Sequence, residues 1–178
     1  MSRTLSFAAI LLLFTAAFAV AQEPPAVKPG PEHALLKKME GTWDAVMKMA
    51  EVPAPMKAVA TYKMELDGLW LTSEFKMDDP AMKFTGRGLD TFDAARKKYV
   101  GIWIDSMSTS PMVMEGTFDE KTKTTTMAGE GPGRDGKPQK YKMTTKHVDD
   151  NHQKFEMFMV GADGKETSAF TIDYTRRK

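Results

Sequence analysis

Gly41-Thr42-Trp43 opens the first of about ten segments in which apolar and polar residues alternate, and Tyr174-Thr175-Arg176 follows the last of them. Small closed β-barrels often join their two ends through a Gly-x-Trp motif in the first strand and an arginine just past the last strand. The indole closes one end of such a barrel, and the guanidinium group stacks on the indole ring. These two tripeptides therefore predict that the first and last strands pair and close the sheet.

The residues between these ends alternate with a period of two. In the segment 58–66, Ala58, Ala60, Tyr62 and Met64 share one face, and Lys, Thr and Glu residues occupy the other. Successive side chains of a strand point to opposite faces, and short turns can join only antiparallel neighbours. The pattern predicts an all-β fold: a single antiparallel up-and-down β-barrel of about ten strands (calycin-like), with a short N-terminal helix. Two packed sheets are the alternative, but closure removes exposed sheet edges.

Two local features refine this prediction. Pro31 fits the first turn of a short helix, with Glu32 near its start, Lys37 and Lys38 near its end and Gly41 just beyond. His33 is placed before the part of this helix that closes the barrel. Glycines 86 and 88 lie in a predicted strand over 83–92, where they indicate a bend or a β-bulge.

The N-terminal residues have the pattern of an export signal. Met1-Ser2-Arg3 is basic, residues 5–18 are apolar but too short to span a membrane, and Ala19-Val20-Ala21 is a small-x-small cleavage site. We predict a signal peptide over 1–21, a Pro-rich tether over 22–30 and a β-barrel domain over 31–178. The protein is therefore expected to be exported, to the periplasm or the cell exterior.

Composition excludes several classes of function. The chain has no cysteine, so it forms no disulfide, thiolate metal site or cysteine nucleophile. Residues 22–178 carry 24 basic and 24 acidic side chains, so no single-sign field attracts nucleic acid or anionic lipid. Charged residues such as Lys63, Glu65 and Lys142 on the outward faces argue against insertion into a membrane as a barrel. We therefore expect neither nucleic acid nor membrane as a partner.

A family resemblance covers most of residues 22–178. The motifs that carry it are Gly68-Leu69-Trp70, the run Tyr99-Val100-Gly101-Ile102-Trp103-Ile104-Asp105-Ser106-Met107-Ser108, and Glu115-Gly116-Thr117-Phe118-Asp119. The chain resembles an uncharacterised bacterial secreted family known only as a domain of unknown function, the 1579 family of such domains. The Gly-x-Trp opening is also distantly similar to lipocalins, fatty-acid-binding proteins and nitrobindin-like haem barrels. That likeness implies a barrel that encloses a ligand.

Methionine is unusually frequent in the predicted interior. Residues 22–178 hold 14 methionines against six leucines and three isoleucines. The pairs Met47/Met49, Met112/Met114 and Met157/Met159 each place two thioethers on one face of a strand. An apolar, adaptable lining is the main interpretation, and a Cu(I) site is the alternative.

The polar candidates are fewer. If Asp105 and Trp103 face inward, the carboxylate lies near a barrel mouth and can orient a ligand. Alternatively, Asp105 caps a turn. His147 shares a face with Tyr141, and an inward histidine can be an axial haem ligand or a hydrogen-bonded wall residue. The predicted ligand-binding residues are Trp43, Met47, Tyr62, Trp103, Asp105, Tyr141, His147 and Arg176.

The leading functional hypothesis is an exported β-barrel that binds a small apolar or amphipathic ligand in a Met-rich interior. The chain has no catalytic fingerprint such as Gly-x-Ser-x-Gly, so we expect no catalytic residue and favour binding over catalysis. We also expect no metal and no cofactor, with haem kept as a lesser alternative. A packed, non-enzymatic barrel that binds a partner in the cell envelope is the other alternative. Ligand identity and oligomeric state stay open.

Overall fold

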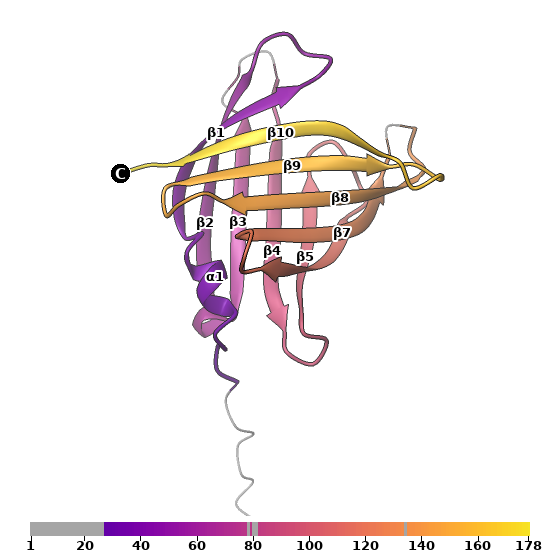
Figure 1. Ribbon diagram of the computed structural model, residues 1–178. Helices are drawn as coiled ribbons and strands as arrows, with labels where there is room; N and C mark the ends of the chain where they lie inside the picture. The colour runs from indigo at the N-terminus through magenta and orange to yellow at the C-terminus, as the bar shows by residue number, and fades with distance from the viewer. Residues whose placement is uncertain (1–26, 78, 80–81, 134) are drawn as a thin grey trace, which may run out of the picture.

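Ten antiparallel strands follow one another around a closed barrel in the computed structural model, which describes residues 27–77, 79, 82–133 and 135–178 (Figure 1). The elements are α1 (His33–Lys37), β1 (Gly41–Met49), β2 (Met56–Glu65), the 3₁₀ turn η1 (Leu66–Gly68), β3 (Trp70–Met77), β4 (Thr85–Asp93), β5 (Lys98–Asp105), β6 (Met112–Asp119), β7 (Thr124–Pro132), β8 (Pro138–His147), β9 (His152–Val160) and β10 (Glu166–Arg176). Each strand pairs with its sequence neighbours, and β1 pairs with β10. The predicted ten-stranded up-and-down barrel with a short helix is confirmed.

The predicted signal peptide, residues 1–21, lies outside the described residues, as does the tether up to residue 26. Residues 27–30 precede α1 without regular secondary structure. Within the described part of the chain, no helix is both long enough and apolar enough to cross a membrane.

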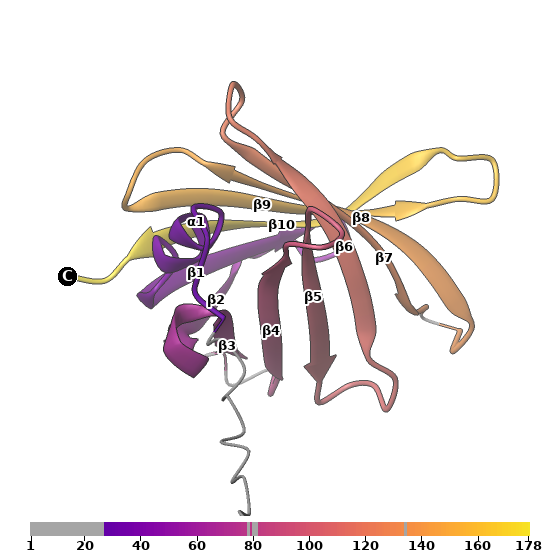
Figure 2. The same cartoon turned by 90° about the horizontal axis from the view of Figure 1, so that it is seen from below.

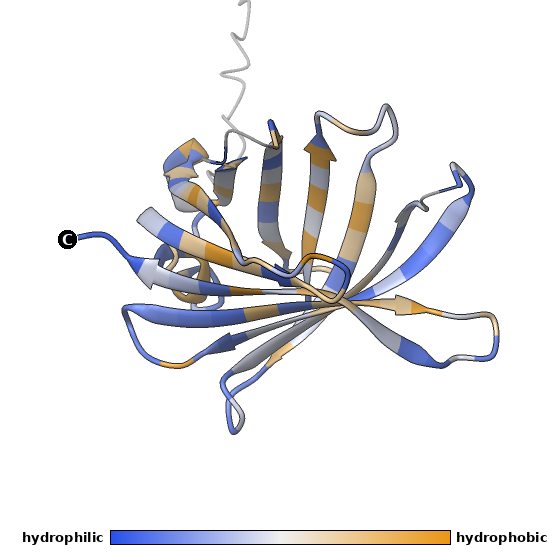
Figure 3. Cartoon of the chain, turned by 90° about the horizontal axis from the view of Figure 1, so that it is seen from above, coloured by the Kyte–Doolittle hydropathy of each residue, from blue (hydrophilic) through white to orange (hydrophobic). Residues whose placement is uncertain are grey.

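The alternation of residue types decides which side of each strand faces the barrel interior. On β1, Trp43, Ala45 and Met47 are buried, whereas Asp44 and Lys48 are exposed. Bands of high and low hydropathy alternate along the strands in Figure 3. The strands β8–β10 cross in front of β2–β5 at a steep angle, so the two sides of the barrel face one another across its interior (Figure 1).

The two ends of the sheet join at Trp43 and Arg176, which are direct partners in the β1–β10 ladder. The Arg176 guanidinium carbon lies 4.1 Å from the centroid of the Trp43 ring, and the indole Nε1 donates to the Met39 carbonyl at 2.8 Å. Arg176 also donates to the carbonyl oxygens of Lys38 and Glu40. The predicted stacking is therefore present. Arg176 is the last residue of β10, not a residue beyond the strand.

Gly41 makes room for this closure. Its φ of +118° is rarely adopted by a residue with a side chain, and a Cβ at this position would lie 3.0 Å from Arg176 Nη1. The backbone conformation therefore requires the glycine of the Gly-x-Trp motif, and the missing side chain leaves room for the guanidinium group beside it.

Helix α1 covers one end of the barrel, where it lies against β2, β3 and β4 (Figure 2). Leu36 packs with Leu71 and Tyr99, and the Tyr99 hydroxyl donates to the Glu32 carbonyl at 3.1 Å. His33 was expected before the helix but is its first residue and is buried, because its ring packs edge-on against Phe92. These contacts order a helix that is too short to be stable alone.

The β-bulge expected as one alternative at glycines 86 and 88 is absent. Strand β4 pairs with β3 and β5 without a register shift, and the irregular pairing lies in β10 between Ser168 and Phe170. Gly86 instead faces the Trp103 ring: a Cβ at Gly86 would lie 2.0 Å from Trp103 Cζ2. The glycine is needed for close side-chain approach, not for backbone distortion.

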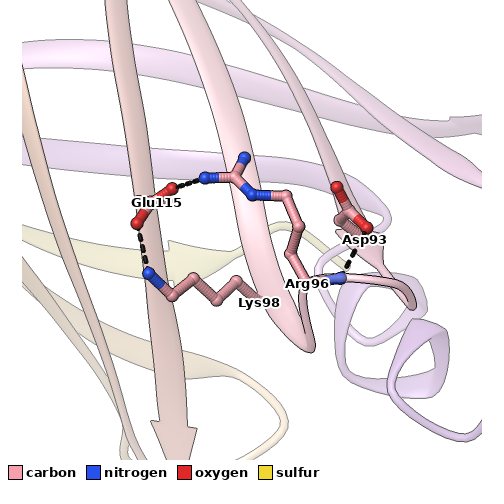
Figure 4. A network of polar contacts seen from close by, with 4 residues as sticks. All are labelled: Asp93, Arg96, Lys98 and Glu115. Carbon is pink, nitrogen blue, oxygen red and sulfur yellow. Dashed lines mark hydrogen bonds and ion pairs between the residues drawn. The ribbon is translucent and has the colours of Figure 1, made fainter.

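The outer surface carries ion pairs that link neighbouring strands. Glu115 of β6 contacts both Arg96 and Lys98, and the Asp93 carboxylate accepts the Arg96 backbone N–H at 3.0 Å (Figure 4). The hydrogen bond from Lys98 is the main reason that the pKa of Glu115 is lowered. Because these groups are exposed, they contribute little to stability and mainly keep the outer face polar.

Candidate ligand-binding cavity

A cavity of about 490 Å³ occupies the barrel interior. It extends from Leu36 and Met39 at the α1 end to Met107 and Pro132 at the other end. Six of the eight predicted ligand-binding residues line it: Met47, Tyr62, Trp103, Asp105, Tyr141 and His147. Trp43 and Arg176 do not line the cavity, because they form the closure of the sheet beside α1.

Methionine forms much of the cavity wall. Twelve of the 15 methionines line it, including both members of all three Met-x-Met pairs. Met112, Met143 and Met157 form one buried cluster against Phe155 and other partly buried apolar side chains. Such a wall is apolar and can adapt to ligands of different shape. Within the described residues, no three His, Asp or Glu side chains are grouped so that they could hold a metal ion.

Asp105 and Trp103 both point into the cavity, but they bond to each other. The indole Nε1 donates to Asp105 Oδ2 at 3.1 Å, and the Met107 backbone N–H donates to Asp105 Oδ1 at 2.8 Å. Both carboxylate oxygens are therefore engaged. The arrangement favours the turn-capping interpretation of Asp105, with the added task of fixing the Trp103 ring in the cavity wall.

Replacing Gly86 with alanine is expected to displace the Trp103 ring, because the added methyl group would overlap it. Overpacking of this kind destabilises a protein by about 1–3 kcal/mol. Urea denaturation would measure the loss, and near-UV circular dichroism would report the ring's new environment. In a Trp103→Phe background the same glycine substitution should be less destabilising; an equal loss in both backgrounds would contradict the assigned contact.

His147 is a wall residue with partners of its own. Its Nε2 lies 3.2 Å from Thr125 Oγ1, and its ring packs edge-on against Phe118 at a centroid distance of 5.8 Å. Burial, followed by the nearby charge of Lys38, lowers the pKa of His147. The imidazole is therefore neutral at pH 7. Tyr141 is similarly engaged, since its hydroxyl donates to the Pro132 carbonyl at 2.8 Å.

The sequence-based prediction missed Asp90, which also lines the cavity. Asp90 lies on β4 between Leu71 of β3 and Gly101 of β5. Within the described residues it accepts no hydrogen bond and forms no ion pair. Burial alone raises the pKa of Asp90 to about 7. Asp90 lies inside the barrel, but its side chain is only partly covered by other protein atoms because the carboxylate borders the cavity.

Two tyrosines lie in the same part of the cavity as Asp90. Burial raises the pKa of Tyr62 to about 12, with a smaller opposing effect from a hydrogen bond to Tyr174 and a further increase from the Asp90 charge. Burial also raises the pKa of Tyr174 well above its usual value. The tyrosine pair is therefore neutral and hydrogen-bonded internally.

A signal for Asp90 was present in the sequence. Glycines 86 and 88, Asp90 and Phe92 have the same parity on one strand, so an inward Gly86 implies an inward Asp90. The inward direction of Gly86 becomes evident only once Trp103 of the neighbouring strand is seen against it.

Comparisons with known proteins agree with this architecture. The crystal structure of Rv2717c from M. tuberculosis superposes with a TM-score of 0.60 and 11% identity, over 84% of this chain and 99% of that chain. The S-type phycobiliprotein lyase CPES from Guillardia theta superposes with a TM-score of 0.56 and 10% identity, over 83% of this chain and 93% of that chain. At these identities the likeness shows the barrel fold alone.

No curated protein matches the sequence. A family model described as "Protein of unknown function (DUF1579)" matches residues 28–176, which include α1, all ten strands and both halves of the Trp43–Arg176 closure. The chain therefore belongs to the DUF1579 family.

Proposed function

We propose that this protein binds a small, mainly apolar ligand inside the barrel. The cavity of about 490 Å³, lined by thioether and aromatic side chains, is the observation that carries the proposal. Small-molecule sites are typically apolar cavities of about 300–1,000 Å³ with a few polar groups. We place the protein in the periplasm or outside the cell, on the strength of the export pattern in residues 1–21.

The alternatives have less support. A packed barrel that acts only through its outer surface needs a filled interior, whereas this interior contains the cavity. Asp105 also gives little support to catalysis, because both of its carboxylate oxygens are bonded. The cavity offers haem one imidazole, whose Nε2 is already close to Thr125, so the residues do not fit a haem site. A Cu(I) site would rest on thioethers alone.

Native mass spectrometry of the purified protein tests the proposal directly. We expect an additional mass of a few hundred daltons that disappears after extraction into organic solvent. Binding of the neutral apolar dye Nile red to the extracted protein would be measured in parallel. A protein that carries no extra mass and does not bind the dye would contradict the proposed function.

Replacing Met143 with tryptophan is expected to weaken Nile red binding at least about tenfold, because the larger ring would fill part of the cavity. Met143 is buried on β8, and its side chain lines the cavity wall. Val113→Trp is the matched control, since Val113 is 57% exposed on the outer face. Dye fluorescence titration measures both variants. Equal weakening in the two would place the dye outside the barrel.

A further inference from the structure

Two acceptors in the cavity lining have no hydrogen-bond partner among the described residues. Among the described residues, the Asp90 carboxylate has no hydrogen bond or ion pair, and the buried Gln153 Oε1 has no hydrogen-bond partner. Gln153 Nε2 contacts Met39 Sδ at 2.8 Å, so the amide nitrogen has a partner whereas the oxygen has none. An unpartnered buried acceptor such as Gln153 Oε1 is uncommon in proteins and needs an explanation. A ligand that supplies donors would give a partner both to this oxygen and to the Asp90 carboxylate at the cavity wall.

The charges of the cavity have one sign. Its described lining contains two carboxylates, Asp90 and Asp105, and neither lysine nor arginine; His147 is its only imidazole. Asp105 is already bonded to Trp103 and Met107, so Asp90 is the carboxylate available to a ligand. A fatty acid or another anion would meet this carboxylate with no cation to offset it.

Two neighbouring glycines accommodate the Asp90 carboxylate, which borders the cavity. A Cβ on Gly101 would lie 2.4 Å from Asp90 Oδ1, and a Cβ on Gly88 would lie 3.5 Å from Oδ2. The Asp90 charge contributes to the raised pKa of Tyr62, which is neutral and hydrogen-bonded to Tyr174 and so offers Asp90 no positive charge. Among the described residues no cationic group pairs with the carboxylate, so a counter-ion for its ionised form would have to enter the cavity with the ligand.

We propose that the cavity selects ligands that carry a protonated amine on an apolar body, with the Asp90 carboxylate as the counter-ion of the ammonium group. This inference rests on the proposed ligand-binding function. An ammonium N–H donor supplies both the charge and the hydrogen bond that burial denies to Asp90, whereas the methionine wall takes the apolar body. A neutral alcohol of the same length supplies only the apolar contact and a weaker hydrogen bond.

Three ligands of equal chain length test this selectivity. Decylammonium, decanol and decanoate would each compete with Nile red for the extracted protein at pH 8.5, where Asp90 is ionised and the alkylammonium remains protonated. We expect decylammonium to bind about tenfold more tightly than decanol, which corresponds to about 1.4 kcal/mol. Decanoate should bind most weakly of the three.

Asp90→Asn retains the shape of the side chain and removes its charge. The ratio of decylammonium affinity to decanol affinity should fall to near one in this variant. Glu130→Gln removes a carboxylate from an exposed position outside the cavity and should retain the tenfold ratio. Each ratio is internal to one variant, so it does not depend on equal stability.

The outcomes separate the inference from the proposed function. If Nile red and decanol bind but wild-type protein shows no preference for decylammonium, amine selectivity is wrong and ligand binding stands. A preference that persists in Asp90→Asn also overturns the inference, because another group would then recognise the amine. If neither the dye nor any decyl compound binds, the proposed function itself fails.

Discussion

Replacing Trp43 with alanine is expected to lower the free energy of unfolding by about 3–5 kcal/mol, the usual effect of truncating a large buried aromatic ring. Trp43 is only 1% exposed and packs in the cluster that contains Ala45, Met47 and Phe75. Its loss would leave a void where β1 meets β10, and would remove the ring on which Arg176 stacks. Urea denaturation followed by far-UV circular dichroism measures the change.

Arg176→Ala and the double variant Trp43→Ala/Arg176→Ala separate two contributions to stability: the contact between Trp43 and Arg176 that closes the barrel, and the burial of the Trp43 ring. The guanidinium lies over the indole, so each single substitution removes the same contact. The sum of the two single losses in the free energy of unfolding should therefore exceed the loss in the double variant by about 1 kcal/mol. Leu89→Ala on the exposed outer face of β4 is the control, with an expected loss below about 1 kcal/mol. If Trp43→Ala were no more harmful than this control, the indole could not be central to barrel closure.

The fold was predictable because two independent signals agree on it. Alternation with a period of two fixes which face of each strand is buried, and Trp43 with Arg176 identifies the strands that must pair to close the sheet. Both signals are local in sequence and depend on elementary strand geometry. The predicted bulge is wrong because a glycine in a strand can indicate either a backbone irregularity or the close approach of a neighbouring side chain. Distinguishing them requires knowing that Trp103 of the neighbouring strand lies against Gly86.

The polar part of the site was less predictable for a similar reason. The motif around Trp103 makes Asp105 a candidate for binding a ligand, but both of its carboxylate oxygens form local bonds that a turn readily supplies. Asp90 is distinguished by what it lacks, since no residue in the described part of the chain bonds to its carboxylate. Lack of a partner is a property of the whole barrel, and no pattern along one strand encodes it.

The Asp90 carboxylate is also expected to make the free protein less stable as pH rises. Its pKa is about 7 in the folded protein, against 3.8 for an exposed aspartate. Between these two values the folded state holds a proton that the unfolded state has released. The free energy of unfolding therefore falls by about 1.4 kcal/mol per pH unit across this window, and levels off above it.

Comparison with Asp90→Asn isolates this contribution. His147, whose pKa is lowered in the folded protein, changes stability in the opposite direction below its unfolded value of 6.5, but equally in both proteins. From pH 5 to pH 8, we expect the variant to gain about 3 kcal/mol relative to wild type in urea denaturation. A constant difference would mean that Asp90 is ionised throughout and already has a partner. Added decylammonium should reduce this gain of the variant over wild type at pH 8. Bound ligand stabilises only the folded state that binds it, and wild type should bind decylammonium more tightly than the variant does.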